Sequence, residues 1–86
     1  MVIWKERLKL ADKQVITMHS GAKILDVQVQ KTHLYVWFLC DQSANTVDRT
    51  FTIYGTGRPI PDNPGEYIAT FQLDNGSLVF HVFEEK

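Results

Sequence analysis

Apolar and polar residues alternate along much of the chain, and a period of two is typical of β-strands that bury one face. The clearest case is residues 23–30 (KILDVQVQ), where Leu25, Val27 and Val29 share one face and polar residues occupy the other. The same alternation, or a run of β-branched residues, predicts further strands at residues 2–10, 14–19, 34–40, 47–54, 66–73 and 77–83.

Two of these regions carry additional information about the fold. Residues 34–40 (LYVWFLC) are apolar throughout, which predicts a central strand covered on both faces, with Trp37 and Phe38 as its heaviest core residues. The dipeptide Asn75-Gly76 separates two alternating segments and predicts a type I′ hairpin turn. No segment shows a convincing helical period. We therefore expect an all-β fold, a single domain over residues 1–86 with six or seven mostly antiparallel strands in a sandwich or small barrel.

The most irregular stretch is residues 54–67 (YGTGRPIPDNPGEY), which holds all three prolines of the chain. Gly55 and Gly57 suit a sharp exit from the preceding strand because glycine adopts positive φ without a steric clash. The prolines fix φ and stiffen the rest of the loop. Ile60 is the only strongly apolar residue within the loop, and we expect it to attach the loop to the core.

Two interpretations of this loop stay open. In the first, the backbone amides of Gly55, Thr56 and Gly57 and the guanidinium of Arg58 form an anion-binding concavity. In the second, the loop is a rigid crossover between two sheets or sheet edges. The glycine spacing is not that of a dinucleotide or phosphate-binding fingerprint, and no helix is predicted after it.

Charge and hydropathy narrow the classes of partner. The net charge of −1 argues against general nucleic-acid binding. The longest apolar run, seven residues, is far too short to span a bilayer as a helix. Cys40 is the only cysteine, which fits a reducing compartment, and no signal-peptide pattern is visible. We therefore expect a cytoplasmic protein that does not bind membranes.

Side chains with catalytic or metal-binding chemistry are few and scattered. His19, His33 and His81 lack the spacing of a metal site, and Cys40 has no predicted base beside it. We therefore expect no catalytic residue, no metal, no cofactor and no enzymatic activity. His81 lies in mid-strand, and we expect it to be half-buried and hydrogen-bonded to a backbone carbonyl or a loop residue; a role in ligand binding is the alternative.

Aromatic residues make up 12 % of the chain, more than one small core buries fully. We expect some of them to face a partner protein or a second copy of the chain. The alternative is ordinary partial exposure on the two faces of a sandwich. The residues expected to bind a partner come from the loop, its aromatic neighbours and the mid-strand histidine: Tyr54, Gly55, Thr56, Gly57, Arg58, Tyr67 and His81.

Several sequence blocks together resemble a family of short uncharacterised proteins of tailed phages, prophages and some bacteria. These blocks are IWKERLKL near the start, AKILDVQVQ, LYVWFL, RTFTIYGTGRPIP, YIATFQ and the ending GSLVFHVFE. The resemblance covers nearly the whole chain, and the GTG-x-P loop and the LVFHVFE ending are its most specific parts. It implies a phage or prophage context, in the cytoplasm of a host cell, where small proteins often act by binding host components.

The residues and the resemblance together favour a non-enzymatic protein that binds a host protein, such as an immune or regulatory factor. One alternative is an oligomeric sponge that sequesters a nucleotide-derived signalling molecule. There the loop amides and Arg58 would hold phosphate, while Tyr54, Trp37 or Tyr67 stacks on a base. Another alternative is a structural or virion-associated module.

Overall fold

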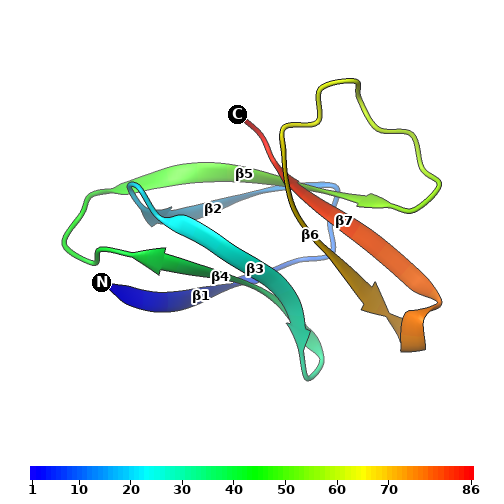
Figure 1. The fold of residues 1–86 in the computed structure, drawn as a ribbon, viewed down its shortest axis with the longest axis horizontal. Coiled ribbons are helices and arrows are strands. Elements are labelled where there is room, and N and C mark those ends of the chain that lie inside the picture. Colours follow the sequence, from blue (N-terminus) through cyan, green and yellow to red (C-terminus); the bar gives the residue numbers. More distant parts are fainter.

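The computed structural model describes residues 1–86 as seven strands in two antiparallel sheets (Figure 1). The first sheet has the strand order β1-β4-β3, and the second has the order β2-β5-β7-β6. The strands are β1 (Val2–Leu8), β2 (Lys13–His19), β3 (Lys23–Gln30), β4 (His33–Cys40), β5 (Thr46–Gly55), β6 (Glu66–Leu73) and β7 (Leu78–Glu84). The expected all-β fold is confirmed. No helix is long and apolar enough to cross a membrane.

The core lies between the inner faces of the two sheets, as the period of two requires. On β4 every second residue is buried, beginning at Leu34 and ending at Cys40. Each faces an inner residue of β1 or β3, for example Leu8 and Val29 on either side of Leu34. The thirteen buried apolar residues are Leu8, Met18, Ala22, Val27, Leu34, Val36, Phe38, Cys40, Phe51, Ile53, Ala69, Phe71 and Val82.

The prediction that β4 is covered on both faces is wrong. Strand β4 is central in its sheet, but only one face of that sheet meets the other sheet. Phe38 is buried as expected, whereas Trp37 lies on the outer face and is only partly covered. Its cover comes from neighbours on the same outer face, where Tyr35 lies 5.7 Å away between ring centroids. An all-apolar strand therefore marks the centre of this sheet without marking a third layer.

A β-bulge changes the face that one predicted core residue occupies. The register of β3 against β4 shifts between Ile24 and Asp26, which leaves Leu25 without a direct partner. The extra residue reverses the alternation on one side of the bulge. Ile24 consequently packs against the core, while Leu25 is 45 % exposed, in contrast to the expected inward position.

A buried ion pair closes one end of the core. The guanidinium of Arg49 donates from Nε and Nη2 to the carboxylate of Glu84, and from Nη1 to the backbone oxygen of Ala22. The hydrogen bond to Glu84 raises the pKa of Arg49 above its ordinary value. Glu84 is therefore not part of a solvated chain end, although it is the third residue from the C-terminus, because its carboxylate is buried and connects β7 to β5.

The β6–β7 hairpin turns at Asn75 and Gly76, which confirms the prediction. These residues have positive φ angles of 54° and 88°, as a type I′ turn requires, and the Ser77 amide donates to the Asp74 carbonyl. Asp74 also has positive φ, so the turn is a tight left-handed segment inside a slightly longer loop.

The loop at residues 56–65 joins β5 to β6, although β7 lies between these two strands in the sheet. Both β5 and β6 pair antiparallel with β7, so they run parallel to each other. The chain must therefore return along the length of the sheet before β6 begins, which it does in the wide arch at the upper right of Figure 1. The interpretation of the loop as a crossover is correct, and this crossover stays within one sheet.

Candidate functional site

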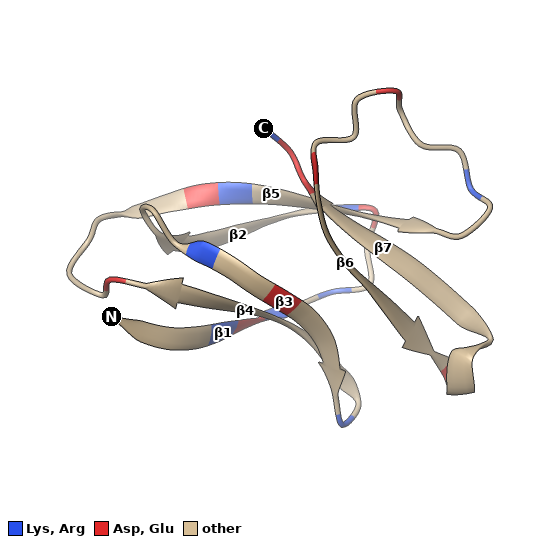
Figure 2. Cartoon of the chain, viewed as in Figure 1, with Lys and Arg blue, Asp and Glu red and all other residues tan.

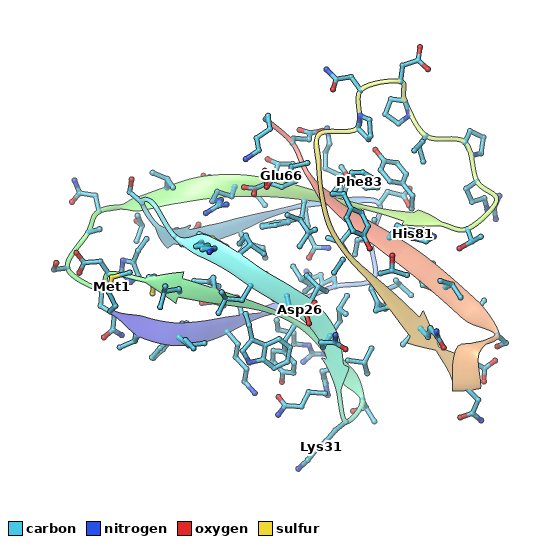
Figure 3. All side chains as sticks on the ribbon, in the orientation of Figure 1. Met1, Asp26, Lys31, Glu66, His81 and Phe83 are labelled. Carbon is cyan, nitrogen blue, oxygen red and sulfur yellow. The ribbon has the colours of Figure 1, made fainter.

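The seven residues predicted to bind a partner lie around a single hollow of about 250 Å³ on the outer face of the β2-β5-β7-β6 sheet. Two further residues complete its lining, Ile60 from the loop and Phe83 from β7. In Figure 3 the labelled His81 and Phe83 lie on β7, close to the base of the 56–65 arch. Residues that are far apart in sequence thus meet because the crossover passes the outer face of β7.

Strand pairing places the floor of the hollow. Tyr54 of β5 is directly opposite His81 of β7, and Tyr67 of β6 is directly opposite Phe83 of β7. Directly paired residues of antiparallel strands point to the same face, so all four side chains stand on the outer side of the sheet. Alternation along β7 alone places His81 and Phe83 on one face, but only the strand order brings Tyr54 and Tyr67 to their two sides.

Three aromatic rings form the apolar part of the hollow. The Phe83 ring lies between the two tyrosines, with centroid distances of 5.8 Å to Tyr54 and 5.6 Å to Tyr67. Both contacts are edge-to-face, with interplanar angles of 68° and 72°. This geometry is favourable for aromatic pairs and fixes the rings relative to one another. Tyr67 is still 55 % exposed, so much of its surface is available to a partner.

A chain of hydrogen bonds orders the polar part. The Thr56 hydroxyl donates to the Val79 carbonyl and lies 2.7 Å from Nε2 of His81. Nδ1 of His81 is 2.9 Å from the Thr70 hydroxyl, which is 2.7 Å from the Tyr67 hydroxyl. The tautomer of His81 decides which of these two hydroxyl contacts the ring donates to and which it accepts from.

The structure places His81 largely as the sequence predicts. Its side chain is half-buried and bonds to a loop residue, Thr56, as expected. Both ring nitrogens lie within hydrogen-bond distance of threonine hydroxyl groups, so the histidine connects the start of the loop at Thr56 to Thr70 on β6. No group of three or more His, Cys, Asp or Glu side chains is placed to hold a metal ion.

Two backbone amides at the start of the loop donate to protein acceptors, and one of them, that of Thr56, is among the three amides considered for an anion-binding concavity. The amide of Thr56 donates to the Val79 carbonyl, and the amide of Arg58 donates to the Gly55 carbonyl. These bonds tie the loop start to β7 and close a turn, so the two amides are directed at protein acceptors. Gly57 has a positive φ of 84°, whereas the φ of Gly55 is not positive, which corrects the reason given for that glycine.

Arg58 has a free guanidinium. Arg58 is exposed, and its side chain takes part in no hydrogen bond or ion pair. The acidic residue at the start of β6, Glu66, pairs with Lys86. The first part of its stem packs near Gly55, where an added Cβ would lie 3.5 Å from Cγ of Arg58. Arg58 also lines a second, larger hollow of about 600 Å³ on the other side of Tyr54. Its charge is therefore available at the rim shared by two concavities.

The expectation that Ile60 attaches the loop to the core is wrong. It is 47 % exposed and overhangs the aromatic hollow, which it lines together with Tyr67 and Phe83. The loop is fixed at its far end by Gly65, which has a φ of 98° and lies against the backbone of Glu84. A Cβ at this glycine would overlap the Glu84 carbonyl oxygen, so the close approach requires the absence of a side chain.

Sequence reasoning missed Phe83, Ile60 and Thr70 as parts of this site. Phe83 could have been found, because it shares its strand face with His81 and lies only two residues away. Thr70 is opposite His81 on β6, a relationship that depends on the register of β6 against β7. A bulge between Tyr67 and Ala69 shifts that register and keeps both Tyr67 and Thr70 on the outer face.

The comparisons with known proteins give a family without an assigned activity. The whole chain, residues 1–86, matches a family model described as a domain of unknown function (DUF7352). A search of curated proteins and a search of solved structures gave no match. On the match over its full length, the chain belongs to the DUF7352 family of domains of unknown function.

Proposed function

We propose that this protein is a non-enzymatic binding protein of a phage or prophage, and that it acts in the host cytoplasm on a host protein such as an immune or regulatory factor. The observation that supports this most directly is the aromatic hollow with a free arginine at its rim. An apolar or aromatic side chain of the partner would enter between Tyr67 and Ile60. A partner carboxylate would pair with Arg58.

The chemistry of the hollow fits a protein partner. Protein interfaces are enriched in tyrosine, phenylalanine and arginine, and a few such residues carry most of the binding energy. The rings are held by edge-to-face contacts and the loop by prolines, so little conformational entropy is lost when a partner binds.

The test combines capture and titration. The tagged full-length protein would be used to isolate its partner from infected or host cells, and the purified partner would then be titrated with Arg58→Ala. We expect the thermal melt to be unchanged and binding to weaken by about 2–3 kcal/mol, as for a lost charge-assisted hydrogen bond. Arg7→Ala, on the other sheet, is the matched control and should bind normally. Equal binding by wild type and Arg58→Ala would rule out Arg58 as a contact.

The second candidate function is that of an oligomeric sponge, which would sequester a nucleotide-derived signalling molecule. It is supported by two tyrosine rings beside an unpaired arginine, since bases stack on aromatic rings and arginine binds phosphate. The engaged amides of Thr56 and Arg58 count against a phosphate cradle, so Arg58 alone would hold the anion. Free nucleotides should then raise the melting temperature of wild type but not of Arg58→Ala, whereas a protein binder should show no such rise.

A further inference from the structure

A third concavity lies between the sheets, away from the aromatic hollow. Its volume is about 710 Å³, within the usual range of small-molecule sites. The first sheet contributes the row Leu8, Leu34 and Val29, which are directly paired across β1, β4 and β3. Phe71 and Leu73 of β6 face them from the second sheet. In Figure 1 the β3–β4 and β6–β7 turns lie apart at the lower edge of the view, and the concavity is lined by Thr32 and His33 near the first turn and by Leu73 near the second.

Leu10 stands at the mouth of this concavity. It is 55 % exposed and lines both the 710 Å³ concavity and the neighbouring hollow beside Arg58. The segment that carries it is held in place, because the side chain of Gln14 bonds both the amide and the carbonyl of Lys9. The Asp12 carbonyl also accepts from the amide of Ile53 on β5. The opening is therefore a preformed part of the fold.

The polar groups around the opening are all basic or neutral. Arg7, Lys9 and His33 line it together with Thr32, and no aspartate or glutamate does. Neither Arg7 nor Lys9 takes part in an ion pair, since the three salt bridges of the chain involve other cations. Figure 2 shows basic positions along β1 and its continuation toward β2, and one at the β3–β4 turn. An apolar interior with a cationic rim is complementary to a molecule that has an aliphatic tail and an anionic head.

We propose that this concavity binds an anionic amphiphile, a linear alkyl carboxylate, independently of the aromatic hollow. The tail would lie over Val29, Leu73 and Leu10, the apolar lining residues that the core leaves partly or largely exposed, where burial of each methylene is favourable. The carboxylate would remain at the rim near Lys9 and Arg7, partly solvated and charge-paired. The acid-free lining gives the selectivity for an anion over a cation of the same tail length.

The test uses the full chain, with sodium decanoate below its micelle concentration as the probe. Calorimetry gives the affinity, and amide chemical shifts give the location. We expect one decanoate to bind and to shift the amides of Val29, Leu34 and Leu73. Acetate lacks the tail and decyltrimethylammonium carries the opposite charge, so each should bind at least about tenfold more weakly, the factor that corresponds to 1.4 kcal/mol.

Two variants and their controls locate the site. Leu10→Asp changes an exposed residue, so it should melt like wild type while weakening decanoate binding by about tenfold or more, through lost apolar contact and charge repulsion. Leu25→Asp, at an exposed leucine of the β3 bulge, should bind decanoate normally. Lys9→Glu should weaken binding similarly, whereas Lys23→Glu should not.

Three outcomes would overturn the proposal. One is that folded wild-type protein does not bind decanoate, or binds it no better than decyltrimethylammonium. Another is that the shifted amides scatter over the surface, or that Leu10→Asp binds as wild type does. The third is binding to anionic phospholipid vesicles without binding to free decanoate, which would assign the basic rim to a membrane surface instead.

Discussion

The outer faces of the two sheets both carry aromatic residues, yet they differ in what they can bind. On the β1-β4-β3 sheet, Tyr35 and Trp37 lie side by side, and the Lys5 ammonium is 4.2 Å from the centroid of the Tyr35 ring. Trp37 lines none of the three hollows described above. On the β2-β5-β7-β6 sheet, the crossover loop turns a similar aromatic group into a hollow.

Exposed aromatic residues alone do not make a candidate site. The Tyr35–Trp37 pair is covered by a lysine from the same face, a cation–π contact that adds modest stability. The rings around Phe83 have no such cover and lie beside a free arginine. The 56–65 loop is what distinguishes the two faces, so a substitution in the loop should have a larger effect than one in the rings.

Gly65→Ala should have the largest effect. The added Cβ would overlap the Glu84 carbonyl oxygen, and the φ of 98° is unfavourable for alanine. We expect a loss of about 3–4 kcal/mol in the free energy of unfolding, from overpacking and backbone strain together. Chemical denaturation measures it. Gly57→Ala is the control, because its φ is also positive but nothing lies within 4 Å of the added Cβ, so it should cost only about 1 kcal/mol.

Tyr67→Ala should separate binding from stability. The ring is more than half exposed and lies at the centre of the proposed contact surface. We expect partner binding to weaken by about 2 kcal/mol or more, as at an interface hot spot, while the free energy of unfolding falls by only about 1 kcal/mol. Titration and denaturation of the same variant test this. If Tyr35→Ala weakened binding equally, the distinction between the two faces would fail.

Trp37→Ala should be milder than a core truncation. A fully buried tryptophan would cost about 3–5 kcal/mol, but this ring lies partly exposed on the outer face. We therefore expect a loss of about 1–2 kcal/mol, from the apolar area that Tyr35 and Lys5 cover. Denaturation gives the stability, and titration should show unchanged partner binding. A loss as large as that for Phe38→Ala would mean that the outer face is covered in solution.

Replacement of Asp41 should have the smallest effect on stability. Asp41 begins the loop that joins β4 of one sheet to β5 of the other, so its contribution does not distinguish the two outer faces. Hydrogen bonds from Ser43 lower the pKa of Asp41 below its ordinary value of 3.8. A lowered folded-state pKa adds stability above the unfolded-state pKa, and this stability is lost as the pH falls through the folded-state pKa. The melting temperatures of wild type and Asp41→Asn should therefore differ slightly at neutral pH and converge in acid. A difference that grows in acid would contradict this.

Much of the fold and the membership of the site were predictable from local pattern. Strands at 23–30 and 66–73 agree with the structure to the residue, because alternation and turn chemistry act over neighbouring positions. A loop, its aromatic neighbours and one histidine predict the candidate binding residues Tyr54 to Arg58, Tyr67 and His81, and these residues line one hollow. Local pattern failed at Leu25 and Trp37, where a bulge and a one-sided sheet decided which side chains are buried.

The sequence by itself determined where the strands are, where the hairpin turns, and that residues 56–65 form a stiff loop. It could not determine that β7 inserts between β5 and β6, since strand order depends on contacts between distant segments. That order directs the loop past the outer face of β7 and places Thr56 beside His81. As a result, the Thr56 amide donates to the Val79 carbonyl, while the Arg58 amide donates to the Gly55 carbonyl. It also buries Glu84 against Arg49. Alternation specifies one face of each strand, whereas only tertiary packing specifies which strands share that face.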